Sequence, residues 1–198
     1  MLALNPRFDH DYDYDMTALT KPRITVDEFL FWAKDEPGRY ELFRGEVHAM
    51  SPEGVGHAER KGAVYTALVT AIRARGLPYR ALPDGATVRI DDTTAYEPDA
   101  LVYCGEKLPP EALEVPNPII VVEVLSPSTR RVDVALKLIG YFRLPSVAHY
   151  LIVDPALPSI LHHARQASGD ILTRILTDGS ITLDPPGIEI ALADIYGA

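Results

Sequence analysis

The stretch Ile119-Ile120-Val121-Val122-Glu123-Val124-Leu125 decides the fold, because it is the most β-prone segment of the chain. A continuous run of branched apolar residues is typical of a strand that is covered on both faces of a sheet. We therefore expect a central strand over residues 119–125. Glu123 departs from the pattern, since an unpaired carboxylate inside such a strand is costly. Its side chain must be protonated, ion-paired, metal-bound or at a strand end that faces a cleft.

The sequence around this strand predicts helices alternating with strands. A capping box at Thr25–Glu28 opens a short helix that Pro37-Gly38 ends, and short alternating runs about Arg44-Gly45 predict a β-hairpin. Two more helices are predicted over about residues 57–75 and 131–142. Further strands are expected over residues 79–82, 86–90, 100–104, 147–154, 160–164 and 171–176, then a final short pair, with a turn at 91–94. This order indicates an α/β (mixed α+β) fold in which helices flank one mixed sheet.

Composition narrows the class of protein. The 198 residues are 47% apolar and carry 28 acidic against 19 basic side chains, a net charge of −9 that argues against a broad cationic nucleic-acid-binding face. No apolar run approaches the ~20 residues that cross a bilayer, and the N-terminus lacks a signal-peptide pattern. Cys104 is the only cysteine, which excludes an intrachain disulfide, and we expect its side chain to be buried. We expect a cytoplasmic protein with no membrane partner.

The N-terminal residues differ from the rest of the chain. Residues 1–21 show no sustained periodicity, and Asp alternates with Tyr over residues 11–15. We interpret residues 1–21 as a flexible acidic arm and residues 22–198 as a single domain.

A second carboxylate precedes another apolar strand. Glu97-Pro98-Asp99 leads directly into residues 100–104, which places Asp99 at a strand start. Carboxylates on adjoining strands can converge on a hard cation such as Mg²⁺, which prefers oxygen ligands. Such a cation can activate water and neutralise a phosphoryl group. On the helix that follows the central strand, Lys137 shares a face with Asp133 and Tyr141 and can reach the Glu123 region.

These residues carry a resemblance to a known family. The chain resembles the Uma2 family, which is grouped with the PD-(D/E)xK restriction-endonuclease-like superfamily. The likeness runs in order from about Ile24 to Asp154, and its most specific part is the Glu-Val-Leu-Ser-Pro-Ser-Thr segment at residues 123–129. The matching motifs are Tyr40-Glu41-Leu42, Gly45-Glu46, His57, Glu97-Pro98-Asp99, residues 122–129 and Asp133…Lys137…Tyr141.

The resemblance implies a restriction-endonuclease-like core and DNA phosphodiester hydrolysis with Mg²⁺, for which Mn²⁺ can substitute. By motif position, Asp99 and Glu123 hold the metal, whose activated water attacks phosphorus. The superfamily lysine normally lies two residues after the second acid, where this chain has Leu125, so the resemblance assigns the amine to Lys137. It also implies Glu41 as a further catalytic acid, a homodimer by analogy, and three supporting residues: His57, Glu46 and Tyr141.

Other interpretations of the same residues stay open. Glu123 can form a buried salt bridge with Lys137 and no metal. The acidic charge and the displaced lysine fit a catalytically inactive, dimeric binding or regulatory module of the same fold. A metal-dependent hydrolase of a smaller phosphoester would use the same residues. A serine hydrolase is disfavoured because Ser126 and Ser128 lack the Gly-x-Ser-x-Gly turn, and His162-His163 is interpreted as structural.

Overall fold

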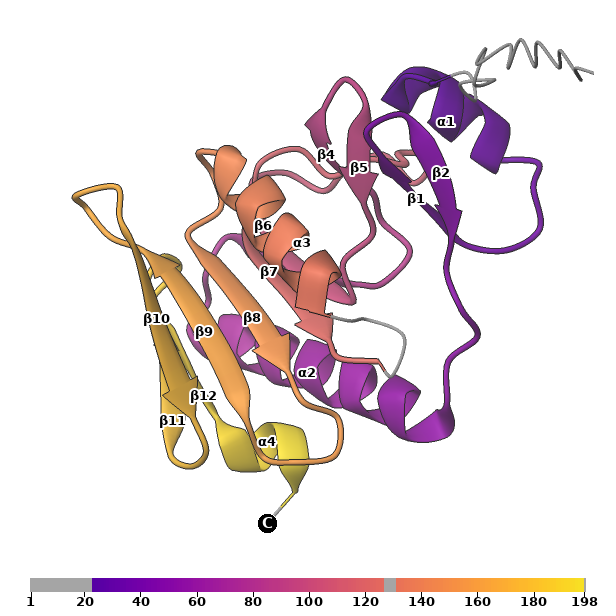
Figure 1. Cartoon of the computed structure of the whole chain (residues 1–198). Helices are drawn as coiled ribbons and strands as arrows, with labels where there is room; N and C mark the ends of the chain where they lie inside the picture. The colour runs from indigo at the N-terminus through magenta and orange to yellow at the C-terminus, as the bar shows by residue number, and fades with distance from the viewer. Residues whose placement is uncertain (1–22, 127–130, 198) are drawn as a thin grey trace, which may run out of the picture.

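The computed structural model describes residues 23–126 and 131–197 (Figure 1). The acidic arm predicted over residues 1–21 lies outside the described residues, as do residues 127–129 of the Glu-Val-Leu-Ser-Pro-Ser-Thr segment. The described part of the chain forms four helices: α1 (Val26–Ala33), α2 (Val55–Ala74), α3 (Arg131–Arg143) and α4 (Leu192–Tyr196). The capping box at the start of α1 is present, with both reciprocal hydrogen bonds between Thr25 and Glu28.

The strands form three sheets, whereas the sequence predicts one. The largest has six strands in the order β10-β9-β8-β7-β6-β3, in which only β7 and β8 run parallel within the described residues. The N-terminal sheet has the order β2-β1-β5-β4, and β11 pairs with β12. The bounds are β1 (Tyr40–Phe43), β2 (Glu46–Ala49), β3 (Tyr79–Pro83), β4 (Val88–Asp91), β5 (Thr94–Tyr96), β6 (Ala100–Cys104), β7 (Pro118–Val124), β8 (His149–Val153), β9 (Ile160–Arg165), β10 (Ile171–Leu176), β11 (Ser180–Leu183) and β12 (Ile188–Ala191).

The central strand is confirmed, and helices cover both of its faces. In β7 every residue except Ile119 is buried. Ile120, Val122 and Val124 pack with α2 in one hydrophobic cluster, whereas Val121 belongs to a second cluster with α3. Since successive side chains of a strand point to opposite faces, Glu123 lies on the α3 side with Val121. In Figure 1, α3 and α2 accordingly lie on opposite sides of the large sheet.

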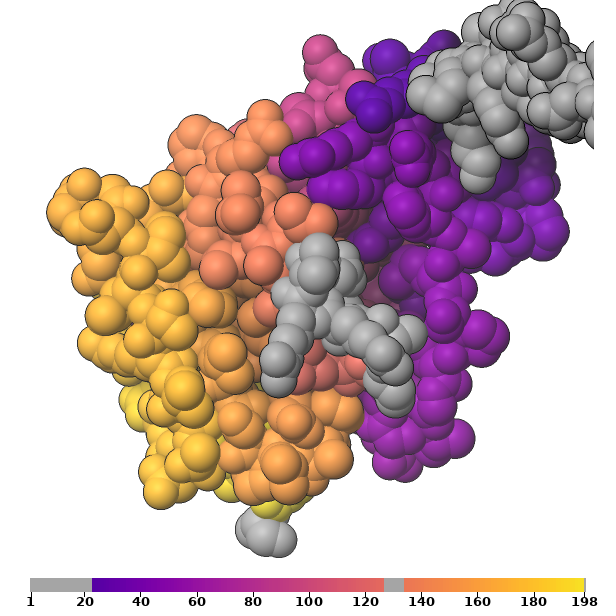
Figure 2. All heavy atoms as spheres, viewed as in Figure 1, coloured from indigo at the N-terminus to yellow at the C-terminus, as the bar shows by residue number. Residues whose placement is uncertain are grey.

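A glycine brings the N-terminal sheet against α3. At Gly140 a Cβ atom would lie 2.7 Å from Cε2 of Tyr96, so only glycine permits this close approach of α3 to β5. Lys137 lies one turn before Gly140 and therefore faces the same sheet. This contact places β1, with Glu41, beside the end of β7. Figure 2 shows α1, β1 and β2 as a lobe, in indigo and purple, above the start of α2.

Some details depart from the sequence prediction. Residues 94–96 form β5, where the sequence predicts a turn at residue 94 and no strand, and α4 is not predicted either. The prediction of a buried thiol is wrong, because Cys104 is the last residue of β6 and is exposed. No helix in the described residues is both long and apolar enough to span a membrane.

Candidate metal centre

A cavity of about 570 Å³ opens where the end of β7, the start of α2 and the N-terminal sheet meet α3. Its wall contains apolar side chains such as Phe43 and Met50. Its charged lining comes from five different parts of the chain, and consists of Glu41, Glu53, Asp99, Glu123 and Lys137. The charged side chains of the cavity are therefore mainly acidic, and the cavity lies at the carboxyl end of β7.

Lys137 lies between two of these carboxylates. Its Nζ donates to Oε1 of Glu41 at 2.8 Å and to Oε1 of Glu123 at 3.0 Å. The hydroxyl of Tyr141, one turn further along α3, donates to the same Glu123 oxygen at 2.7 Å. We call these four residues the Lys137 cluster. The lysine side chain is only 5% exposed, so the prediction that the amine reaches Glu123 from the following helix agrees with the geometry.

Within the Lys137 cluster, Glu123 has a strongly raised pKa. Burial raises the pKa of Glu123 to about 8, and the charges of Glu41 and Asp99 act in the same direction against the attraction of Lys137. Burial also raises the pKa of Tyr141 well above its usual value, with Glu123 contributing, so the phenol stays a hydrogen-bond donor. Without a further cation, the Glu123 carboxyl therefore retains a proton near neutral pH.

Asp99 lies beside the same end of β7. Ala100 pairs with Val122, so β6 and β7 are antiparallel neighbours and Asp99 comes level with Glu123. The Oδ2 atom of Asp99 accepts a hydrogen bond from the Val124 backbone N–H at 2.7 Å. Asp99 and Glu123 thus line one cavity from adjoining strands, as the sequence predicts.

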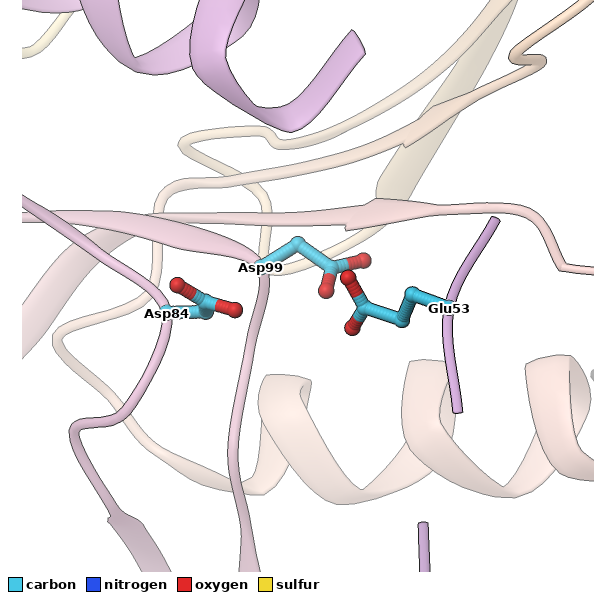
Figure 3. A group of neighbouring side chains, drawn as sticks. All are labelled: Glu53, Asp84 and Asp99. Atoms are coloured by element: carbon cyan, nitrogen blue, oxygen red, sulfur yellow. The ribbon is translucent and has the colours of Figure 1, made fainter. Parts of the chain in front are cut away.

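A second buried lysine contacts Oδ1 of Asp99, the carboxylate oxygen that the Val124 N–H does not bind. Lys61, on α2, lies with its Nζ 3.0 Å from Oδ1 of Asp99, 2.6 Å from Oε1 of Glu53 and 2.5 Å from Oδ2 of Asp84. We call these four residues the Lys61 cluster; its three acidic members are drawn in Figure 3. Burial alone would lower the pKa of Lys61, but its hydrogen bonds to the three acids raise it, so the amine stays charged.

Arg39 connects the Lys61 cluster to the N-terminal sheet. Its guanidinium donates to Glu53 at 3.1 Å, to Asp84 at 2.8 Å and, through Nε, to Glu97 at 2.7 Å. The Glu97 backbone N–H in turn donates to Glu41 at 2.9 Å. A continuous network of hydrogen bonds therefore joins the two lysine clusters.

The supporting residues predicted from the sequence have different fates. His57 Nε2 lies 2.8 Å from the Val124 carbonyl oxygen and its Nδ1 3.4 Å from Oε2 of Glu53, so it lines the cavity. Tyr141 belongs to the Lys137 cluster. Glu46 is exposed in β2, opposite Phe43, and does not line the cavity.

Sequence reasoning missed the Lys61 cluster. Glu53 and Asp84 lie in loops, where acidic residues are ordinary. Lys61 gave a usable signal, because it is spaced three and seven residues from the buried Val64 and Leu68 and so interrupts the apolar stripe of α2.

Fold and site define a nuclease-like α+β protein. The structure matches a crystal structure described as "a putative nuclease belonging to DUF820" from Anabaena variabilis, with a TM-score of 0.70 over 87% of this chain and 97% of that chain. At 16% identity this likeness concerns the fold alone. Within that class the chain belongs to the Uma2 family, described as "Putative restriction endonuclease", whose profile matches residues 26–193. The resemblance found in the motifs is thereby confirmed.

A further relative is similar over nearly its whole length. A Synechocystis sp. protein named "Uncharacterized protein slr1290" is 25% identical over 185 residues, which cover 88% of this chain and 92% of the relative. The relationship therefore extends beyond the cavity to the entire fold.

Proposed function

We propose that this protein is a Mg²⁺-dependent endonuclease that hydrolyses phosphodiester bonds in DNA, and that Mn²⁺ can replace Mg²⁺. The observation that carries the proposal is the position of Lys137, which holds Glu41 and Glu123 in a cavity that Asp99 also lines. Two carboxylates from adjoining strands and a buried amine form the residue set of the PD-(D/E)xK superfamily. Membership of the Uma2 family supports nucleic acid as the substrate class.

The donor set fits a hard divalent cation. Asp99 and Glu123 offer carboxylate oxygens, and each oxygen can accept more than the hydrogen bonds described above. Burial raises the pKa of Glu123, and a cation bound by Asp99 and Glu123 would favour the charged carboxylate again. When bound, Mg²⁺ would supply Lewis-acid polarisation of a phosphoryl oxygen and activation of a water molecule.

The residues around this pair fix its geometry. The Val124 N–H orients Asp99, and the Tyr141 hydroxyl orients Glu123. Glu41 holds the Lys137 ammonium at the cavity wall, where its charge stabilises negative charge that develops on a phosphate in the cavity. In this proposal Asp99, Glu123 and Lys137 are catalytic, Glu41 supports the amine, and the protein acts as a cytoplasmic homodimer so that both strands of a duplex can be cut.

Plasmid cleavage tests the proposal. We expect nicking or linearisation of supercoiled DNA that needs Mg²⁺ or Mn²⁺ and stops with EDTA. Asp99→Asn and Glu123→Gln should each reduce the rate by about 10²-fold or more. The matched controls are the exposed Asp178→Asn and Glu106→Gln, which should cleave like the wild type.

Absence of wild-type cleavage with every divalent ion would contradict the proposal. DNA binding without cleavage would then favour the inactive binding module, in which Lys137 and Glu123 form only a buried salt bridge. Cleavage of small phosphodiesters but not of DNA would instead favour the smaller phosphoester as substrate.

A further inference from the structure

The acidic side chains of the Lys61 cluster are arranged like ligands of a cation. Glu53 precedes α2, Asp84 follows β3 and Asp99 precedes β6, yet each places one carboxylate oxygen within 4.8 Å of the other two. In Figure 3 the Glu53 and Asp84 carboxylates lie on either side of Asp99. Oxygens that bind one divalent cation at about 2.1–2.5 Å lie at comparable separations. The spacing alone therefore suits a metal.

The position between these oxygens is already taken by Lys61. Its Nζ is within hydrogen-bond distance of all three acids, at 2.5–3.0 Å. A lysine ammonium has three N–H donors, so three carboxylates match its hydrogen-bonding capacity. The side chain is only 7% exposed, and its stem lies on the buried stripe of α2 with Val64 and Leu68.

A divalent ion and this ammonium cannot share the three acids. Two cations within about 3 Å repel each other strongly, most of all away from water. Withdrawal of the ammonium would carry a buried side chain out of the interface between α2 and the large sheet. In the Lys137 cluster the ammonium donates to Glu41 and Glu123, and both carboxylates line the cavity.

We propose that Lys61 is a positioning residue that occupies the place of a second divalent cation, so that the site holds a single metal, at Asp99 and Glu123. The inference rests on the proposed function and adds the metal stoichiometry to it. Lys61 binds Oδ1 of Asp99 while the Val124 N–H binds Oδ2, so the shared carboxylate is held from both sides. Glu53 and Asp84 then serve as anchors for the ammonium rather than as metal ligands.

Counting bound Mn²⁺ on the full chain, by calorimetry and by the loss of the free-ion electron paramagnetic resonance signal, tests the inference. We expect one Mn²⁺ per wild-type chain and two per Lys61→Met chain. The second ion should disappear in Lys61→Met/Asp84→Asn, whereas Lys61→Met/Glu123→Gln should retain only the new one. Lys61→Arg and the exposed Lys107→Met should bind one ion, like the wild type.

The possible results separate this inference from the proposed function. Two ions on the wild type, or one on Lys61→Met, would overturn the inference and leave the nuclease proposal standing. No ion on the wild type would overturn the metal site itself and the inference with it. If Lys61→Met does not fold, the wild-type count still decides, since one ion supports the inference and two refute it.

Discussion

The two buried lysines of this molecule lie in different electrostatic environments, although both contact acids near the same end of β7. In the Lys61 cluster, burial alone would raise the pKa values of Glu53 and Asp84, yet contact with the Lys61 ammonium holds both below their usual range. In the Lys137 cluster, burial prevails and the pKa of Glu123 rises to about 8 despite the adjacent ammonium. The first cluster is a satisfied ion network, whereas in the second burial disfavours the charged form of Glu123.

The difference follows from how deeply the acids in each cluster are buried. Lys61 meets its acids at the edge of the structure, where the Glu53 and Asp84 side chains are 24% and 33% exposed and keep part of their hydration. Glu123 lies inside a strand that is buried on both faces, so it loses its hydration and gains two partners. A strongly raised pKa of a carboxyl group that lines a cavity is typical of a functional site rather than of a stabilising ion pair.

Asp99 belongs to the Lys61 cluster and lines the cavity together with Glu123 and Lys137, so its removal should have the largest effect. We expect Asp99→Ala to reduce plasmid cleavage by about 10³-fold. It should also lower the free energy of unfolding by about 3 kcal/mol, because the buried Lys61 loses a carboxylate partner. Cleavage assays and urea denaturation measure the two losses. Asp178→Asn is the surface control. A variant that loses activity without stability would show that Asp99 matters only to the Lys137 side.

Replacing each lysine by methionine should separate the clusters. Lys137→Met should reduce cleavage by about 10²-fold with a modest stability loss, since Glu123 already carries a proton near neutral pH. Lys61→Met in EDTA should lower the free energy of unfolding more, by about 3 kcal/mol, because Glu53, Asp84 and Asp99 are left facing one another. Urea denaturation of both variants beside Lys107→Met makes the comparison. Equal stability losses would contradict the distinction between them.

Only part of this arrangement could be predicted from the sequence. The apolar run fixes β7, and carboxylates in or before apolar strands reveal Glu123 and Asp99. The partition into three sheets could not be predicted, because β5 has three residues and pairs with Leu42, far away in the chain. The start of α2 at Val55 rather than residue 57 also gave no signal, since the Gly54 cap has no side chain.

Residues of the site could be predicted where a charged side chain interrupts the apolar pattern of a strand. A charge in a strand is conspicuous, whereas Glu53 and Asp84 lie in loops that favour acids anyway. Family resemblance supplied Glu41, which the structure brings to Lys137, and Glu46, which it leaves exposed in β2. Glu46 pairs with Phe43 and so shares a face with Glu41, but it lies two residue pairs nearer the hairpin turn than the Glu41 side chain that contacts Lys137.

The pH dependence of the free energy of unfolding should reveal the raised pKa of Glu123. Because the pKa of Glu123 is raised from 4.5 to about 8 in the folded chain, the folded state binds more protons than the unfolded state between these values. Its contribution to stability is therefore full at low pH and is lost as the pH rises through 8. In EDTA we expect the free energy of unfolding to fall from pH 6.5 to 8, by on the order of 1 to 2 kcal/mol.

The pH window avoids the buried histidines. Burial lowers the pKa of His162 to about 4, so its contribution rises with pH below 6.5 and is constant above. Urea denaturation of the wild type and Glu123→Gln, at matched ionic strength, isolates the carboxyl group. A fall of the same size in Glu123→Gln would show that another group titrates.

The smallest predicted effect refines the balance within the Lys137 cluster. Tyr141→Phe removes one hydrogen bond from Glu123 Oε1 but leaves the Lys137 contact, so stability should change by about 1 kcal/mol or less and cleavage by about tenfold or less. Since this hydrogen bond lowers the pKa of Glu123, its loss should move the pH-dependent fall in stability to higher pH. Lys137→Met should move it further in the same direction, because an ammonium favours the carboxylate more than a phenol does. If Tyr141→Phe shifted the transition more than Lys137→Met, the hydroxyl rather than the amine would be the main partner of Glu123, and the contrast between the two lysine clusters would have to be redrawn around Tyr141.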